Sequence, residues 1–384
     1  MDKPLKIGFL TPFSAVYPFY GQHIMAGVFT ALAQYGLAAK DVVFVPVYIG
    51  QGQYKMVEEA IQKLLFFEGV DLISGMVNIK SLLEIAPLFD TYNKPGLFID
   101  FGELIHPSVG YAKNVGCISM NYWQSEYALG KWAVEEFGPD GQIIMPTYES
   151  GFNLHQAFLD GAGAAGSRAL NSMVMPEHYV DKKHVDLQPF FEAIERDTPN
   201  FVHAIFSGSP GTAFLKEWRA SKFYDAIPLL TIENMAYRDM LSDVQHLNLK
   251  FYAAANWQDT DQSALNQSFT RQFLAANHQP ASVFSMLGFE LGQVLSQMRQ
   301  ELIKGDAAAA IAKFRQSGVT GPRGMINIQG WSMPAYPMVD INRVVTSDQH
   351  INYTVVSQGT ALGYDTTQVF EESVSGYLNP YWSV

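Results

Sequence analysis

Carboxylates and aromatic rings stand where apolar runs of this chain end. Asp100 and Glu233 each close such a run, and the segment 13–20 contains four aromatic residues, including Tyr17 and Tyr20. A carboxylate favours a cationic group, and aromatic faces form an apolar or cation-receiving pocket. These residue types indicate binding of a small molecule with an amine or several hydrogen-bond donors and an apolar body. The alternatives are that Asp100 is a helix cap or turn residue and that the rings pack the protein itself.

A glycine-rich segment resembles a dinucleotide fingerprint in its spacing only. Gly161, Gly163 and Gly166 spell G-x-G-x-x-G, and Asp186 follows about twenty residues later, as that motif requires. The true motif follows a strand and opens a helix, whereas these glycines follow a predicted helix. We therefore interpret them as a helix C-cap and tight return.

Other motifs of catalysis and metal binding also fail. The segment 259–261 begins like a calcium loop, but Ala264 and Thr270 stand where Gly and Glu are needed. The nine histidines include no H-E-x-x-H pair, no serine lies in G-x-S-x-G, and the single Cys117 excludes a multi-cysteine metal site. We therefore expect no metal, no cofactor and no enzymatic activity.

Composition excludes several classes of partner. The chain has 384 residues, long enough for two domains, and 25 basic against 37 acidic residues give a net charge of -12. The charges are scattered and form no basic stripe, so we expect no binding to nucleic acid or to an anionic membrane surface. The apolar segment 283–302 carries Glu290 and Arg299, which is typical of a buried amphipathic helix and not of a membrane span.

Apolar runs rich in Val, Ile and Phe alternate with segments of helical period, which predicts strand-helix units around parallel sheets. This alternation of strand and helix patterns begins again near residue 115, so two α/β lobes are expected. After residue 261 the chain turns helical, and these late helices are predicted to pack on the first lobe. The first lobe is predicted to have strands at 7–11, 42–48, 72–75 and 96–100 and helices at 21–35, 54–67 and 81–92; the late helices are 265–277, 283–303 and 307–316, followed by a strand-like tail from Met325.

Ligands of open parallel sheets bind beyond the carboxyl ends of the strands. This rule selects seven segments as the candidate ligand loops: 12–20, 76–81, 100–103, 146–151, 207–211, 233–235 and 255–257.

The order of several motifs resembles the leucine/isoleucine/valine-type solute-binding proteins of branched-chain amino acid ABC transporters. The resemblance covers nearly the whole chain, and the shared order of the motifs carries it. The segments that resemble the family are KIGFLTP at 6–12, YG at 20–21 with Gly27, VDLISG at 70–75, AP at 86–87, NKP at 93–95, FLDGAGAAG at 158–166 and GPRGMI at 321–326.

The resemblance implies a type I periplasmic binding protein-like fold, with two doubly wound parallel-sheet lobes joined by a three-crossover hinge. The crossovers are expected near 119, 253 and 331. The first lobe would comprise residues 1–119 plus 254–331, and the second residues 120–253 plus 332–384. Function would be closure of the lobes around a ligand, driven by contacts made in the closed state.

The resemblance also implies roles for residues of the first lobe and the second. The family places a ring at Tyr20 and an acid for the ligand's ammonium at Glu233, whose other interpretation is a solvated surface acid. In amino-acid-binding members the loops 76–81 and 100–103 hold the ligand carboxylate. Here only Asn78 and Ser81 keep a suitable amide or hydroxyl, and Asp100 would repel a carboxylate.

The remaining candidate ligand residues come from the second lobe and the hinge. Tyr148 and Ser150 lie in the first ligand loop of the second lobe, and Trp257 lies beside a crossover. Ser209 opens a helix whose free N–H groups could hold an anion or a carbonyl, although such residues are usually only caps.

Together these observations predict an extracytoplasmic receptor that closes on an amino acid or a related amine- or amide-like compound and delivers it to the membrane permease of an ABC importer. We expect a monomer, periplasmic or lipid-anchored outside the cytoplasm. Residues 1–4 lead into an apolar run too short for a signal peptide, so the leader would not be contained in this sequence. The alternatives are a ligand-sensing regulatory domain of the same fold, cytosolic or fused to a signalling module, and an α/β enzyme.

Overall fold

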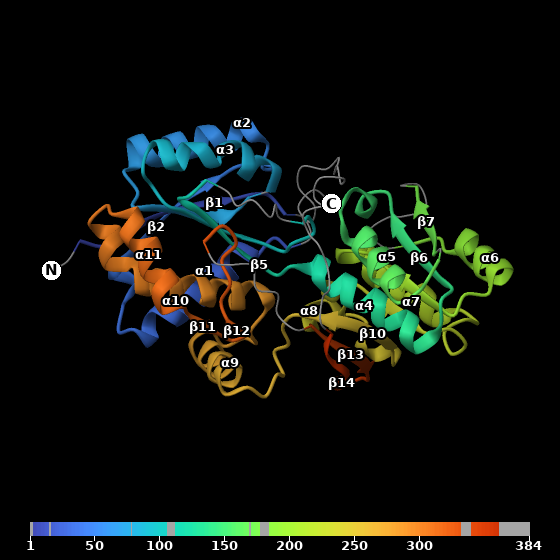
Figure 1. The fold of residues 1–384 in the computed structure, drawn as a ribbon. Helices are drawn as coiled ribbons and strands as arrows, with labels where there is room; N and C mark the ends of the chain where they lie inside the picture. Colours follow the sequence, from blue (N-terminus) through green and yellow to red (C-terminus); the bar gives the residue numbers. More distant parts are fainter. Residues whose placement is uncertain are drawn as a thin grey trace.

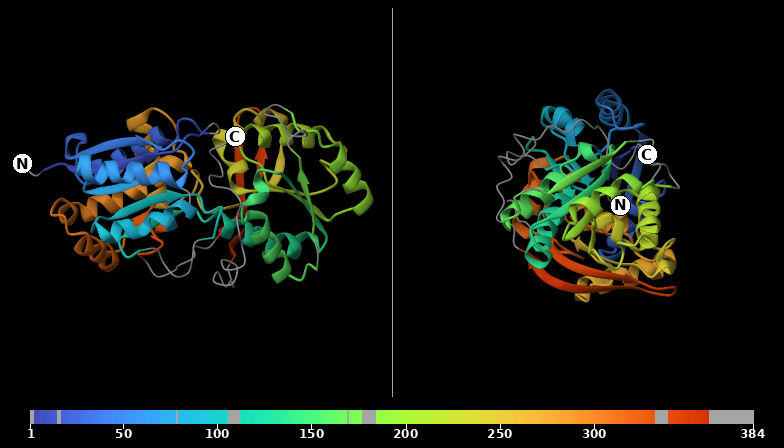
Figure 2. Two further views of the ribbon diagram at one scale, coloured as in Figure 1. Left: turned by 90° about the horizontal axis from the view of Figure 1, so that it is seen from above. Right: turned by 90° about the vertical axis from the view of Figure 1, so that its right-hand side faces the viewer.

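The protein consists of two α/β lobes that lie end to end in the computed structural model (Figures 1 and 2). Each lobe is a sheet covered by helices, and the prediction of two lobes with parallel sheets is confirmed. The residues that the structure describes are 3–14, 17–77, 79–105, 112–168, 170–176, 184–331 and 339–360.

The first lobe contains a five-stranded parallel sheet in the order β2-β1-β3-β4-β5. Every residue of its central strand β3 is buried, because helices cover both faces. Helices α2 and α3 lie on one face, and α1, α10 and α11 on the other (Figure 1). The strands are β1 (Leu5–Thr11), β2 (Val42–Tyr48), β3 (Leu72–Met76), β4 (Gly96–Asp100) and β5 (Val115–Ser119); the helices are α1 (Tyr20–Gln34), α2 (Tyr54–Lys63), α3 (Ile79–Thr91), α9 (Ala264–Asn277), α10 (Val283–Ile303) and α11 (Ala307–Ser317), with a small hairpin of β11 (Thr320–Gly321) and β12 (Gly324–Met325).

The second lobe contains a seven-stranded sheet in the order β14-β13-β10-β9-β8-β6-β7. Its strands are β6 (Gly141–Pro146), β7 (Asn171–Met175), β8 (Phe201–Ala204), β9 (Leu229–Thr231), β10 (Lys250–Ala255), β13 (Val339–Thr346) and β14 (Ile351–Thr360); its helices are α4 (Tyr122–Phe137), α5 (Leu154–Ala164), α6 (Gln188–Asp197), α7 (Gly208–Ala220) and the short α8 (Arg238–Leu241).

The edge of this second sheet differs from a purely parallel arrangement. The strand-like tail expected from the sequence forms β13 and β14, and both pairings, β10 with β13 and β13 with β14, are antiparallel. The reason is local: a short turn at Ser347 and His350 joins β13 to β14, and a connection of that length can join only antiparallel strands.

The chain passes between the lobes after β5 and again after β10. The third passage lies between Trp331 and β13, and its residues 332–338 lie outside the described part of the chain. The exact lobe boundaries expected from the sequence, at 119, 253 and 331, stay a prediction.

In each lobe two helices cross so closely that only glycine fits at the crossing. In the first lobe, a Cβ atom on Gly27 of α1 would lie 2.0 Å from the carbonyl oxygen of Ser285 in α10. In the second lobe, a Cβ atom on Gly161 of α5 would lie 2.0 Å from the carbonyl oxygen of Tyr127 in α4. The N-terminal ends of these four helices carry residues of the cleft, so the crossings fix the positions of those residues.

The G-x-G-x-x-G segment is thereby explained as a packing motif. Gly161 and Gly163 lie inside α5, and only Gly166, with φ +96°, adopts the left-handed conformation expected of a tight return. The interpretation as a helix C-cap therefore applies to Gly166 alone. Nothing lies within 4 Å of a Cβ atom built on Gly163.

Alanine substitutions at two glycines of the same helix should have opposite effects. We expect G161A to destabilise the protein by about 1–3 kcal/mol, because α4 and α5 must move apart. G163A should stabilise it by up to about 1 kcal/mol, because alanine favours a helix interior over glycine. Thermal unfolding of both variants measures the difference, and equal shifts of the melting temperature would contradict the role of Gly161.

A candidate ligand-binding site between the lobes

Five aromatic rings from both lobes meet in one cluster. Tyr17, in the loop after β1, lies 5.0 Å from the ring of Phe284 in the first turn of α10, and Phe101, just after β4, lies 5.3 Å from Phe284. Tyr122, at the start of α4, stacks on Phe101 at 5.4 Å, and the hydroxyl of Tyr122 donates to that of Tyr237 at 3.0 Å. These rings line a narrow pocket together with Asn234 and Val283. We call this set the ring cluster.

A buried hydrogen-bond network links two of the crossovers beside these rings. Glu233 Oε1 accepts from the Tyr237 hydroxyl at 2.9 Å and from the Asn256 backbone N–H at 3.0 Å, and Glu233 Oε2 accepts from the Ser125 hydroxyl. Asn256 Nδ2 donates to the Met120 carbonyl and to Ser125 Oγ, both at 2.7 Å. Because Met120 precedes α4 and Asn256 follows β10, the network joins the two described hinge segments.

Glu233 is therefore no solvated surface acid. It is 1% exposed, and burial raises its pKa to about 7 in spite of the hydrogen bonds from Ser125, Asn256 and Tyr237. The guanidinium of Arg323 opposes this shift, and it is itself held in a two-pronged ion pair with Glu290. Both Glu233 oxygens are used by hinge groups, and its role as a ligand contact stays a prediction.

Two further acids, which the sequence analysis did not select, are buried in loops at the carboxyl ends of β4 and β6. Glu103 lies in the loop after β4 of the first lobe, and Glu149 lies in the short 3-10 helix Glu149–Gly151 after β6 of the second. The loops are joined between the lobes: the Asn153 N–H donates to the Glu103 carbonyl at 3.0 Å, and the Ile105 N–H donates to Asn153 Oδ1 at 3.2 Å.

Burial perturbs both of these acids. It raises the pKa of Glu149 to about 7, although a hydrogen bond to Ser207 lowers it in part. The pKa of Glu103 is raised well above its ordinary value by burial and then by the charge of Asp100, with a smaller contribution from Glu149. Both acids lay within the candidate ligand loops, but nothing in the local sequence marks them as buried.

The structure separates the two tyrosines predicted in the loop after β1. Tyr17 belongs to the ring cluster and is 6% exposed. Tyr20 is also buried, but its hydroxyl donates to the Pro12 carbonyl at 2.7 Å, which ties the loop to its own lobe. The ring of Tyr20 lies 6.0 Å from Phe284, at the edge of the cluster.

The other predicted residues of the first lobe are less central. Ser81 is buried, and its hydroxyl donates to the Gly52 carbonyl at 3.0 Å, which holds the start of α3 to the loop after β2. Asp100 is the last residue of β4, and the thiol of Cys117 on β5 donates a hydrogen bond to it. Asn78 lies outside the described residues.

The predicted residues of the second lobe and hinge are scattered. Tyr148 packs against Phe152, with ring centroids 5.7 Å apart, and Ser150 donates to the Thr147 carbonyl at 2.7 Å. Ser209 is exposed in the first turn of α7. Trp257 donates to Asn266 Oδ1 at 2.8 Å and packs on α9.

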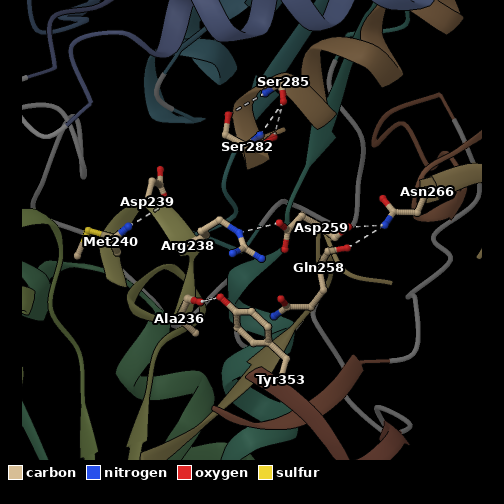
Figure 3. Close-up of polar contacts among 10 residues, drawn as sticks. All are labelled: Ala236, Arg238, Asp239, Met240, Gln258, Asp259, Asn266, Ser282, Ser285 and Tyr353. Atoms are coloured by element: carbon tan, nitrogen blue, oxygen red, sulfur yellow. Dashed lines mark hydrogen bonds and ion pairs between the residues drawn. The ribbon is translucent and has the colours of Figure 1, made fainter. Parts of the chain in front are cut away.

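A cavity of about 270 Å³ adjoins the ring cluster, with which it shares Tyr237 and Val283. On its second-lobe side Arg238 Nε donates to Asp259 Oδ2 at 2.9 Å, and the Tyr353 hydroxyl donates to the Ala236 carbonyl. Figure 3 shows Arg238, Asp259, Gln258 and Tyr353 facing one another, with Ser282 and Ser285 of the α10 N-terminus opposite. This cavity also draws its wall from both lobes.

The described part of the chain lacks two kinds of feature. No three His, Cys, Asp or Glu side chains among those residues group as metal ligands would. None of the helices described has the length and apolar character needed to cross a membrane.

A protein whose two α/β lobes enclose rings and carboxyls beside a hinge has the form of a bilobed solute-binding protein. Comparison with known proteins identifies the family. The family profile described as periplasmic binding protein matches residues 4–332, and the chain belongs to that family. Its family is one of periplasmic solute-binding proteins, which act outside the cytoplasm by binding and not as enzymes.

Individual relatives are distant in sequence and close in fold. The chain is 20% identical over 356 residues to the Leu/Ile/Val-binding protein homolog 6 of Brucella abortus (strain 2308), covering 91% of this chain and 90% of that protein. An ABC transporter substrate-binding protein from Sphaerobacter thermophilus superimposes with a TM-score of 0.77 at 18% identity, covering 93% of this chain and 98% of that one. A solute-binding protein of R. palustris in complex with benzoate gives 0.74 at 19% identity, covering 97% and 99%.

The raised pKa of Glu149 predicts how stability depends on pH. Its pKa is raised from 4.5 to about 7, so the folded state binds this proton more tightly than the unfolded chain does. The resulting stabilisation is complete below pH 4.5 and is lost as the pH rises through 7. E149Q cannot titrate at this position. Between pH 5 and pH 8 it should therefore lose less stability than the wild type, by on the order of 2 kcal/mol, and its melting temperature should fall less.

The control for this measurement is E135Q, at an exposed position of α4. Both substitutions remove one negative charge, so the comparison cancels the effect of net charge. If E149Q and E135Q have the same pH profile, Glu149 does not titrate as its burial requires.

Proposed function

We propose that this protein is the receptor of an ABC importer that closes its lobes on an amino acid or a related amine- or amide-like compound. The observation that carries the proposal is that rings from both lobes meet in one buried cluster, beside the hinge acid Glu233 that accepts from Tyr237. A ligand among them contacts both lobes at once, so it favours the closed state over the open one.

The chemistry of the cleft supports a ligand with an amine or other hydrogen-bond donors and an apolar body. Glu103 and Glu149 supply acceptors, and the ring cluster supplies apolar surface. The relatives bind small organic molecules of comparable size: the Brucella protein is named for leucine, isoleucine and valine, and the R. palustris protein holds benzoate. Benzoate is an anion, and three buried carboxyls disfavour an anion here.

The partner we propose is the membrane permease of the importer, with the receptor acting as a periplasmic or lipid-anchored extracytoplasmic monomer. The family membership supports this role. The alternative is a ligand-sensing regulatory domain of the same fold. Stimulation of the permease's ATPase by the liganded protein separates the two, because a sensor has no reason to produce it.

A thermal-shift screen tests the proposed ligand class. The purified protein is screened against amino acids, their amides, amines and aromatic carboxylates, since a ligand that binds only the folded state raises the melting temperature. We expect hits among the amino acids, amides or amines with apolar bodies. Stabilisation by none of the four groups would contradict the proposal.

Substitution of Phe284 tests the location of the site. F284L removes a ring from the centre of the cluster and should weaken binding of the best hit by about tenfold, the effect of losing roughly 1.4 kcal/mol of contact. The matched control is F67L, which removes a ring that is 85% exposed on the first lobe. Calorimetry measures both affinities, and equal values for the two variants would show that the ligand binds elsewhere.

A further inference from the structure

We propose that Glu103 and Glu149 form the subsite for a cationic group of the ligand, a protonated amine, and that closure of the lobes depends on neutralising these two carboxyls. The inference rests on the proposed function and deepens it. It assigns the cation to a position other than Glu233, the acid that the family resemblance selects.

The first argument is that the two acids come from opposite lobes. Glu103 follows β4 of the first lobe, and Glu149 follows β6 of the second. The hydrogen bonds from the Asn153 N–H to the Glu103 carbonyl and from the Ile105 N–H to Asn153 Oδ1 hold their loops against each other. These contacts join loops of the two lobes, and the charge of Glu149 contributes to the raised pKa of Glu103, so the two carboxyls lie near each other where the lobes meet.

The second argument is that Glu149 has an unused acceptor. Glu149 is 1% exposed, and among the described residues no hydrogen-bond donor contacts its buried Oε2 atom. A buried carboxylate oxygen without a partner is costly, by about 1–3 kcal/mol or more for a charged group. A donor that arrives with the ligand would remove this cost. An ammonium group brings three such donors and a positive charge.

The third argument is that the titratable groups named beside the pair are acids and a phenol. Asp100 lies at the end of β4, and Asp239 lies at the start of α8. The pKa of the Tyr17 hydroxyl is raised by burial and then by the charges of Asp239, Glu149 and Glu103, which places this ring among them. Among the described residues, none of the causes that shift the pKa values of Glu103 and Glu149 is a lysine or an arginine.

The aromatic surroundings fit the same ligand. The face of a tyrosine or phenylalanine ring attracts a cation, and Tyr17, Phe101 and Tyr122 belong to the cluster between the lobes. Glu233, by contrast, already accepts hydrogen bonds from Tyr237, Asn256 and Ser125. Glu233 holds the hinge segments together, and we therefore assign the cationic group of the ligand to Glu103 and Glu149.

A matched set of probes tests the charge preference. Benzylamine, benzyl alcohol and benzoate share one ring and carry a positive, neutral or negative group, and isopentylamine, isopentanol and isovalerate do the same on a branched chain. We expect each amine to bind more tightly than its alcohol and its carboxylate. E103Q and E149Q should each weaken amine binding by at least about tenfold, the effect of losing one charge-assisted hydrogen bond.

The control for the substitutions is E135Q, which should keep the amine affinity of the wild type. Tighter binding of a carboxylate or an alcohol than of the matching amine would overturn the inference. Unchanged amine affinity in E103Q and E149Q would do the same.

A second measurement needs no ligand. Glu103 and Glu149 are buried where the lobes meet, so we expect closure to be disfavoured at high pH, when these carboxyls carry charge. The double variant E103Q/E149Q removes them, and small-angle X-ray scattering of the ligand-free protein at pH 8 should give a smaller radius of gyration for it than for wild type or E135Q. Equal radii would overturn the coupling between these acids and closure.

The two experiments also separate this inference from the proposed function. If benzoate or an alcohol binds more tightly than the matching amine and closes the lobes, the protein is still a solute receptor but the cation subsite is wrong. If no amino acid, amide, amine or carboxylate binds, and the double variant is no more closed than wild type, both proposals fail.

Discussion

The close helix crossings at glycine are the constraint on which the rest of the structure depends. The α1–α10 pair in the first lobe and the α4–α5 pair in the second are in contact at backbone distance, because Gly27 and Gly161 have no side chain there. The N-terminal ends of these helices carry or follow Tyr17, Phe284 and Tyr122. The crossings thus fix the helix ends that carry the cleft residues within each lobe. We infer that movement of one lobe relative to the other takes place at the crossovers.

The crossovers are held by polar contacts and not by apolar packing alone. Asn256 reaches the Met120 carbonyl, and Glu233 accepts from groups of both described hinge segments. A buried network of this kind has well-defined geometry, because an unsatisfied member is costly. We infer that it sets how the two lobes meet, whereas Glu103 and Glu149 set what must lie between them when they do.

Buried charge affects both the hinge and the residues proposed to contact the ligand. Most of the protein's excess negative charge is spread over its surface, but Glu103, Glu149 and Glu233 are buried where the lobes join. The raised pKa values of these acids express the cost of burying charge without a full set of partners. A receptor can use such a cost, because a ligand that removes it contributes selectively to the closed state.

The sequence by itself determined the fold class. Alternating apolar strands and amphipathic helices are local patterns, and they predicted two α/β lobes and the late helices, whereas the ligand loops and a ligand contact at Tyr17 stay predictions. Local patterns did not reveal that the tail adds an antiparallel hairpin to the second sheet, or that Gly161 is needed at a helix crossing. Nor did they distinguish buried Glu149 from its neighbours Tyr148 and Ser150. Burial and partners of a side chain depend on segments far away in the chain, so only the tertiary structure decided that Glu233 accepts from Ser125, Tyr237 and Asn256 and that Glu103 and Glu149 are buried.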